Sequence, residues 1–242
     1  MQIQGRAALV TGASRGLGRA LAFALAGRGA RLALVARHLG PLADVAHTIR
    51  ARGGVAHAIA ADVGDQEATH RIAGEAQGLL GAIDLLVHDA STLGPLPLRL
   101  LLDTDCEDLA AVLETNLVGP FRLTKVLAGA MALRGAGTIV HLSSDAAVEP
   151  YPRWGAYGVS KAAQDHLSRV LAAELDGTGV RVLAVDPGEM DTVMHADAVP
   201  EADRAALQRP EDVAARIVEM IEDPVRAPSG ARLVAPAWER RP

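Results

Sequence analysis

The stretch that decides the fold is residues 11–18, T-G-A-S-R-G-L-G. It follows an apolar run at 6–10 and precedes an apolar-periodic segment at 17–27, so it predicts a turn between a buried strand and a helix. Part of it, from Gly12 to Gly16, fits G-x-S-x-G, the nucleophile elbow of serine hydrolases. Extended to Gly18, it also fits a glycine-rich turn that holds a dinucleotide pyrophosphate at a helix N-terminus. Ser14 is a nucleophile in the first case and lines a phosphate site in the second.

Composition restricts the class of protein. The chain has 242 residues, of which 50% are hydrophobic, enough for one sizeable core. The net charge is -5 and no basic stripe is present, which argues against a nucleic-acid partner. A lone cysteine, Cys106, suits a reducing compartment. The N-terminus does not resemble a signal peptide, and no apolar run reaches the ~18 residues of a membrane span. We therefore expect a soluble, cytoplasmic, single-domain protein (residues 1–242) without a metal site or membrane partner.

Strand and helix patterns alternate regularly along the chain. Strands are predicted at 6–10, 31–36, 55–60, 83–88, 137–142, 180–186 and 232–235. Helices are predicted at 17–27, 41–52, 65–80, 109–133, 156–175 and 211–221. The strands are continuous apolar runs, as expected for a parallel sheet buried on both faces. The predicted fold is α/β: a single-domain, Rossmann-type, doubly wound parallel sheet flanked by helices on both faces, with ligands at the carboxyl ends of the strands.

The hydrolase hypothesis explains few residues. A nucleophile elbow normally lies near the centre of its sheet, with the Asp and His of the triad later in the chain. Here the motif follows the first predicted strand, and none of the eight histidines has a recognisable triad context. The dinucleotide hypothesis explains the strand, the glycines and the helix start together, although the spacing is G-x3-G-x-G. An ordinary glycine-rich turn is the remaining alternative.

Two further motifs place reactive side chains at fixed spacings. Tyr157 and Lys161 form Y-x-x-x-K, and a spacing of four places them on one face of the predicted helix. Ser144 lies 13 positions before Tyr157 (157 − 144), just after a predicted strand. With T-G-x-x-x-G-x-G upstream, the chain resembles the short-chain dehydrogenase/reductase family, roughly from Arg6 to Ile221. Taken alone, Y-x-x-x-K is also a common surface pair of amphipathic helices.

The resemblance implies a reductase that transfers a hydride between a nicotinamide and a ketone or aldehyde. Such a reaction needs a proton for the carbonyl oxygen, and free tyrosine titrates too high, near ~10, to supply it readily. The Lys161 ammonium, together with the positive nicotinamide of the oxidised cofactor, is expected to lower the pKa of Tyr157, the general acid/base. By the resemblance, Ser144 orients the carbonyl, Lys161 also holds the nicotinamide ribose, and Asn116 holds a water that relays protons to Lys161. The alternative for Asn116 is a helix bend before Gly119.

The end of the second predicted strand indicates the cofactor. Enzymes that prefer NAD typically have an acidic residue there, whereas this chain has Ala36 followed by Arg37. Together with Arg15, Arg37 predicts NADP(H), because a guanidinium binds a 2′-phosphate through charge-assisted hydrogen bonds. The alternative is a pair of solvated surface arginines. With the positions that the resemblance adds, the predicted cofactor-binding residues are Gly12, Ser14, Arg15, Gly16, Leu17, Gly18, Arg37, Asp62, Val63, Ala90, Tyr157, Lys161, Pro187, Gly188 and Thr192.

Two departures from the family pattern leave a second function open. His88-Asp89 stands where the family usually has Asn-Asn, and the C-terminal segment lacks the usual V-D-G-G. A non-catalytic, NADP-binding regulatory protein on the same fold is therefore the alternative. The resemblance implies a homodimer or homotetramer and a small-molecule carbonyl or alcohol substrate under a mobile lid at about 190–209. The predicted substrate-binding residues are Ser144, Trp154, Tyr157, Met190 and Met194.

Overall fold

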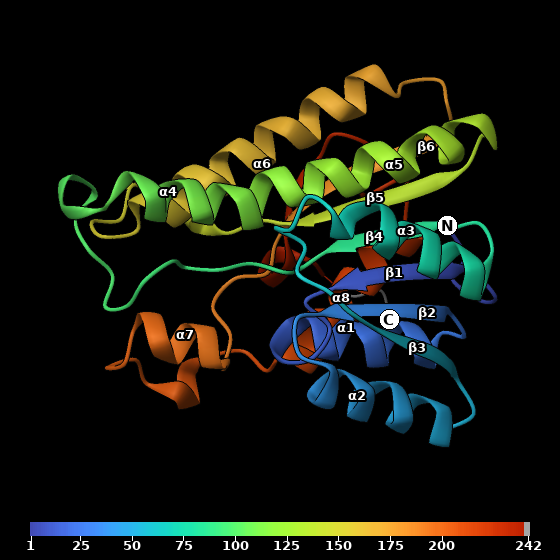
Figure 1. Ribbon diagram of the computed structural model, residues 1–242, viewed down its shortest axis with the longest axis horizontal. Coiled ribbons are helices and arrows are strands. Elements are labelled where there is room, and N and C mark those ends of the chain that lie inside the picture. Colours follow the sequence, from blue (N-terminus) through green and yellow to red (C-terminus); the bar gives the residue numbers. More distant parts are fainter. Residues whose placement is uncertain (240–242) are drawn as a thin grey trace.

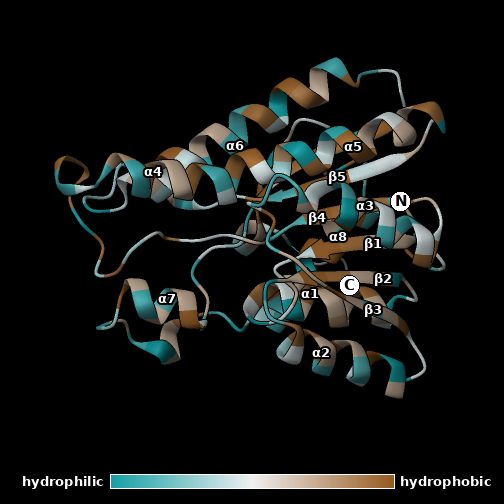
Figure 2. Cartoon of the chain, in the orientation of Figure 1, coloured by the Kyte–Doolittle hydropathy of each residue, from teal (hydrophilic) through white to brown (hydrophobic). Residues whose placement is uncertain are grey.

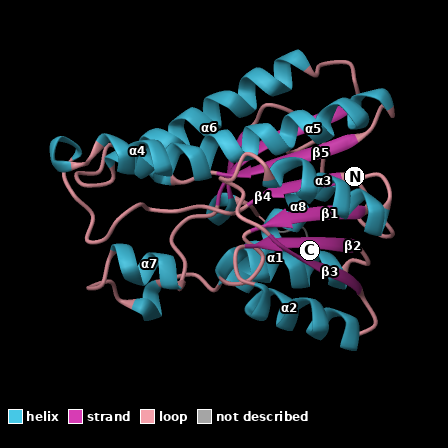
Figure 3. Ribbon diagram, in the orientation of Figure 1, coloured by secondary structure: helices cyan, strands magenta, loops and turns pink. Residues whose placement is uncertain are grey.

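The computed structural model describes residues 1–239 and contains a seven-stranded, fully parallel sheet with the order β3-β2-β1-β4-β5-β6-β7 (Figures 1 and 3). The strands are β1 (Ala7–Thr11), β2 (Arg31–Ala36), β3 (Val55–Ala60), β4 (Leu85–His88), β5 (Gly137–Leu142), β6 (Val180–Asp186) and β7 (Arg232–Val234). The chain winds outward from β1 to β3 and then returns to the other side of β1 with β4. In doubly wound sheets a crevice opens where the strand order reverses in this way. The predicted fold class is confirmed.

Helices cover both faces of the sheet. They are α1 (Gly16–Gly27), α2 (Leu39–Ala51), α3 (Ala68–Leu80), α4 (Cys106–Leu113), α5 (Gly119–Leu133), α6 (Gly155–Glu174), α7 (Val193–Ala198) and α8 (Pro210–Glu222). One apolar core joins the sheet to α1, α2 and α8, and a second joins its other face to α3 and α5. Successive strand residues feed opposite cores, as Leu9 and Val10 do, and both are fully buried. This explains the continuous apolar runs, and Figure 2 shows the strand β1 in the colours of hydrophobic residues.

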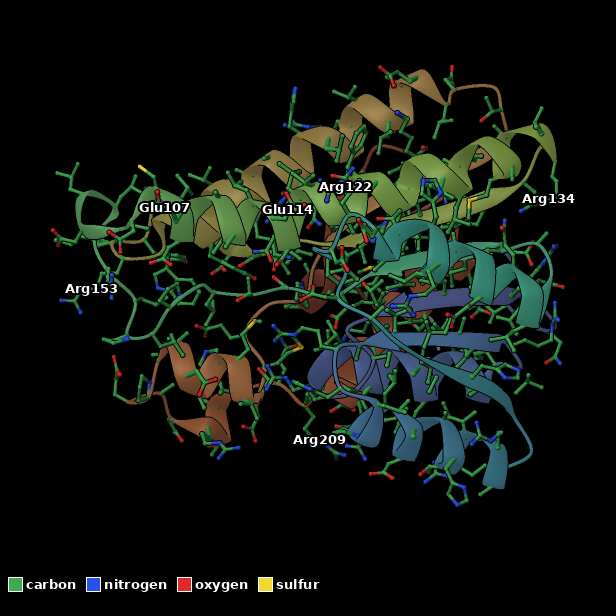
Figure 4. The ribbon with its side chains drawn as sticks, viewed as in Figure 1. Glu107, Glu114, Arg122, Arg134, Arg153 and Arg209 are labelled. Atoms are coloured by element: carbon green, nitrogen blue, oxygen red, sulfur yellow. The ribbon has the colours of Figure 1, made fainter. Side chains whose placement is uncertain are left out.

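The helix predicted at 109–133 differs most from expectation. It starts earlier, at Cys106, and a π-helical turn at Glu114–Val118 separates α4 from α5. The extra residue of such a turn places Asn116 in the fully buried interior. Arg122 and Glu114 form an ion pair across this turn, and Figure 4 shows them close together along the helix.

Gly119 brings the start of α5 against the loop after β3. A Cβ atom at this position would lie 2.1 Å from the carbonyl oxygen of Val63, which no side chain could tolerate. The backbone at the start of α5 therefore lies directly against the backbone of Val63.

The segment predicted as a lid contains the short helix α7, which was not predicted. Figure 1 shows α7 beyond the carboxyl ends of the strands and outside the helix layers. Among residues 1–239, no helix combines the length and the apolar character that crossing a membrane requires.

Candidate active site

A cleft of about 490 Å³ opens at the carboxyl ends of the strands. Its lining extends from Arg37 and His38, after β2, to Tyr157 and Lys161 on α6. All the predicted cofactor-binding residues line it except two. Gly18 packs beneath its floor, and Gly188 lines a neighbouring pocket. The structure thus brings residues from the whole length of the chain together in one cleft.

The glycine turn fits a bound diphosphate. Gly12 has φ +72°, and a Cβ atom there would lie 2.7 Å from the amide nitrogen of Ala90. A Cβ atom on Gly18 would lie 2.5 Å from the carbonyl oxygen of Gly12. Helix α1 begins at Gly16, and no side chain caps its first N–H groups. Such free N–H groups at a helix N-terminus form an anion site that backbone can approach closely.

The hydrolase hypothesis gains no geometric support. Ser14 lines the same cleft beside Arg15 and Gly16. Within residues 1–239, no hydrogen bond joins Ser14 to a histidine, and a serine nucleophile needs such a base. Ser14 lines the cleft at the glycine turn, and its role at a phosphate site stays a prediction.

The outer end of the cleft is cationic. Arg15 and Arg37 are exposed and both line it, close to Asp62 and Val63. Neither guanidinium forms a hydrogen bond or an ion pair with any of the described residues. Asp62 accepts a hydrogen bond from the Gly64 amide at 2.9 Å, which fixes the loop after β3. The outer end of the cleft is thus lined by two guanidinium groups that have no ionic partner among the described residues.

Tyr157 occupies the inner end of the cleft, on the first turns of α6. Its side chain is buried, with 8% of its surface exposed, and Lys161 Nζ lies 5.6 Å from the centre of its ring. Burial raises the pKa of Tyr157 above its ordinary value; the hydrogen bond with Ser144 lowers it, and the Asp89 charge raises it. This direction is the opposite of the sequence-based expectation. Burial thus holds the phenol in its protonated form.

Lys161 is a buried cation in an almost closed environment. Its ammonium donates a hydrogen bond to the carbonyl oxygen of Leu142 at 2.6 Å and lies 3.4 Å from Oε1 of Gln164. Burial lowers the pKa of Lys161 to about 8, although Asp89 and Asp165 act in the opposite direction. The charge of Lys161 is therefore sensitive to pH close to neutrality.

Asn116 is tied into the same network by its π-helical turn. Its side-chain oxygen accepts from the Thr92 amide at 2.8 Å, and its Nδ2 donates to Ser160 Oγ at 2.9 Å. Its backbone carbonyl accepts a hydrogen bond from Nε2 of Gln164 at 2.9 Å. Gln164 thus connects the Asn116 carbonyl with Lys161. Gln164 was not predicted from the sequence. The signal available there was its position three residues after Lys161, which places both side chains on one face of the helix.

The departure at His88 and Asp89 has a structural solution. His88 stacks on His141 of the adjacent strand, with ring centres 4.8 Å apart, and its Nε2 lies 2.9 Å from Thr124 Oγ1. Burial lowers the pKa of both histidines, so both rings are neutral. Asp89 Oδ2 lies against the glycine turn, and burial raises the pKa of Asp89 to about 7. A stacked ring pair thus joins the strands β4 and β5 at the position where the sequence departs from the family pattern.

A second pocket of about 310 Å³ adjoins the cleft at Tyr157 and is named here the substrate pocket. All five predicted substrate-binding residues line it: Ser144, Trp154, Tyr157, Met190 and Met194. Thr192 lines both spaces, and its hydroxyl caps α7 by accepting from the His195 amide at 3.2 Å. The structure therefore places the Ser144, Tyr157 and Lys161 side chains where a cofactor cleft meets a smaller pocket.

Comparisons with known proteins agree with this geometry. The short chain dehydrogenase family model matches residues 6–203. A short chain dehydrogenase of Pseudocercospora fijiensis is 38% identical over 81% of this chain, and the match spans 63% of that protein's length. A Shigella flexneri protein solved in complex with NADP superimposes with a TM-score of 0.90 at 28% identity, covering 97% of this chain and 98% of that one. A 7α-hydroxysteroid dehydrogenase complexed with NADH and 7-oxo glycochenodeoxycholic acid has a TM-score of 0.88 at 28% identity, covering 96% and 93%. The chain belongs to the short-chain dehydrogenase/reductase family of oxidoreductases.

Proposed function

We propose that the protein is an NADP(H)-dependent carbonyl reductase that interconverts a ketone or aldehyde and its alcohol. The observation that carries this proposal is the meeting of Ser144, Tyr157 and Lys161 at the junction between the cofactor cleft and the substrate pocket. A proton donor, a hydrogen-bond donor and a buried cation at one point suit a carbonyl oxygen that gains negative charge.

The residues divide the chemistry between them. NADPH, when bound, supplies the hydride. Tyr157, held protonated by burial, donates its phenolic proton to the carbonyl oxygen, and Lys161 stabilises the resulting phenolate. Ser144 donates to Asp145 Oδ1 at 2.9 Å in this structure, and its hydroxyl has to rotate away from Asp145 to donate to the substrate carbonyl. Asn116 and Gln164 hold the Lys161 end of the site in place.

The preference for NADP(H) rests on this chain's own residues. One related structure contains NADP and another NADH, so relatives of this kind occur with both forms. Here Arg15 and Arg37 flank the outer end of the cleft, and Ala36 stands where a carboxylate would select NAD. A guanidinium pair forms charge-assisted hydrogen bonds with a phosphate, and these are stronger than the bonds it can donate to a neutral ribose hydroxyl.

Replacing Tyr157 with Phe tests the proposed reaction. The wild type should oxidise NADPH across a panel of ketones and aldehydes, and faster than NADH. The Tyr157→Phe variant should lose about 10²–10⁴-fold in kcat, the usual contribution of a general acid, and still bind NADPH. Unchanged turnover in the variant contradicts the proposed mechanism. NADPH binding by a wild type that reduces no carbonyl compound would instead support the non-catalytic regulatory protein. The homodimer or homotetramer and the cytoplasmic location stay predictions.

A further inference from the structure

The substrate pocket has an apolar, aromatic wall. Trp154 lies edge-to-face against Tyr157 at 5.8 Å between ring centres and against Tyr151 at 6.4 Å. The side chains of Leu93, Met190, Met194 and Val199 complete this lining. Rings and thioethers of this kind offer contact area to an apolar substrate body, and ring faces also attract cations.

The same pocket carries carboxylates that lack a strong counter-charge. Asp145 accepts hydrogen bonds from Ser144 Oγ at 2.9 Å, Tyr151 Oη at 3.0 Å and the Ala146 amide at 2.8 Å. All three donors are uncharged, so they orient the carboxylate without neutralising it. Asp186 differs, because Arg232 binds its Oδ2 at 3.0 Å, although the same guanidinium also pairs with Asp165 at 2.8 Å.

Glu189 adds a second carboxylate at the mouth. Its side chain is 70% exposed, and its Oε1 lies 3.6 Å from His195 Nε2, beyond a good hydrogen bond. Among the described residues that line the pocket, none is lysine or arginine, and His195 can compensate for at most one carboxylate. Arg153 lines a different, smaller cavity, and Figure 4 shows its side chain at the outer edge of the molecule.

The same carboxylates act on the neighbouring Tyr151. The pKa of Tyr151 is raised, first by its hydrogen bond to Asp145 and then by the charges of Asp145, Glu149 and Glu189. A pocket lined by one sign of charge repels ligands of that sign and concentrates those of the other.

We propose that the substrate is a carbonyl compound with an apolar body that is uncharged or cationic, and that Asp145 and Glu189 exclude carboxylate- and phosphate-bearing substrates. This inference rests on the proposed reductase function. It assigns the two carboxylates a role in specificity, separate from the chemistry at Tyr157.

A matched set of ketones tests it. The compounds are 4-tert-butylacetophenone, its trimethylammonium isostere, which adds a positive charge with the same shape, and 4-acetylbenzoate, which has a planar, anionic carboxylate at that position. We expect the wild type to show at least about tenfold lower kcat/KM for the carboxylate than for the tert-butyl compound, equivalent to ~1.4 kcal/mol. The trimethylammonium compound should match or exceed the tert-butyl compound.

Variants assign the effect to the named carboxylates. Each substrate is compared between wild type and variant, so that its intrinsic reactivity cancels. Glu189→Gln should improve the catalytic efficiency with the carboxylate ketone, relative to the tert-butyl compound, about threefold. Asp145→Asn should improve it by more, because Asp145 is less screened by solvent. The control is Glu201→Gln, the same change at an exposed position outside the pocket lining.

The outcomes separate the two proposals. If 4-acetylbenzoate is reduced as well as the tert-butyl compound, or better, the charge inference is wrong and the reductase function stands. If no ketone is reduced, the proposed function fails. The charge inference is then decided by calorimetric binding of the three compounds to the NADP⁺-saturated protein, and equal affinities overturn it.

Discussion

The two ends of the ligand-binding region differ in charge and in exposure. At the outer end, Arg15 and Arg37 are exposed, cationic and free of partners among the described residues. At the inner end, Tyr157 and Lys161 are buried, and the adjoining pocket presents Asp145 and Glu189. On our proposals, a phosphate is attracted at one end and repelled at the other. Charge, in addition to shape, would then fix the direction in which a dinucleotide enters.

Removing a guanidinium from the outer end tests this contrast with the largest expected effect. Replacing Arg37 with Ser should lower the ratio of kcat/KM for NADPH to that for NADH by about 10- to 100-fold, because a hydrogen bond to a charged group contributes ~1.5–3 kcal/mol. Parallel kinetics with the two cofactors measure the ratio. Arg169→Ser, at an exposed position outside the cleft, should leave it unchanged. An unchanged ratio in Arg37→Ser would mean that the outer end does not recognise the 2′-phosphate.

Asp89 places a titrating carboxyl group between the two ends, against Gly12 and Gly18. Its pKa is raised to about 7, so it is neutral below that pH and anionic above it. The anion would repel a diphosphate in the glycine turn. We expect Asp89→Asn to bind NADPH about three- to tenfold more tightly than wild type at pH 8, with the difference vanishing at pH 5.5. Fluorescence titration gives both constants, and a difference of equal size at both pH values would rule out titration of Asp89 as its cause.

Gln164 offers the smallest change, confined to the inner end. Lys161 is cationic below its pKa of about 8, so the rate of carbonyl reduction should fall as pH rises through that value. Replacing Gln164 with Glu brings a carboxylate near Lys161 Nζ and favours its charged form, so the alkaline limb of the pH profile should move up by about one unit. The exposed Gln66→Glu should not move it. A limb that stays in place in Gln164→Glu would show that it does not report Lys161.

The fold was predictable because its signals are local and repeated. Apolar runs end at glycine turns, and the order of strands and helices then allows few sheet topologies. The π-helical turn at Glu114–Val118 was not predictable, because its residues are apolar and polar in a pattern that an ordinary helix also shows. Helix α7 has six residues, too few for periodicity to reveal.

The candidate site was predictable where residues stand at fixed spacings, as Tyr157 and Lys161 do. It was not predictable where two partners lie on separate elements. His88 was visible only as a departure, because its stacking on His141 depends on the register of β4 and β5. Gln164 read as one more polar residue of an amphipathic helix, and only the packing of α6 against the π-helical turn joins it to the Asn116 carbonyl.

The backbone contact at Gly119 has a consequence for the coupling between the two ends. Val63 belongs to the lining of the outer end, and the turn just before Gly119 carries Asn116 of the inner end. Because no side chain separates the helix from the Val63 carbonyl, this contact fixes the distance between the outer and the inner end of the cleft. A larger residue at position 119 would push Val63 and Asn116 apart, and both ends would lose their alignment together.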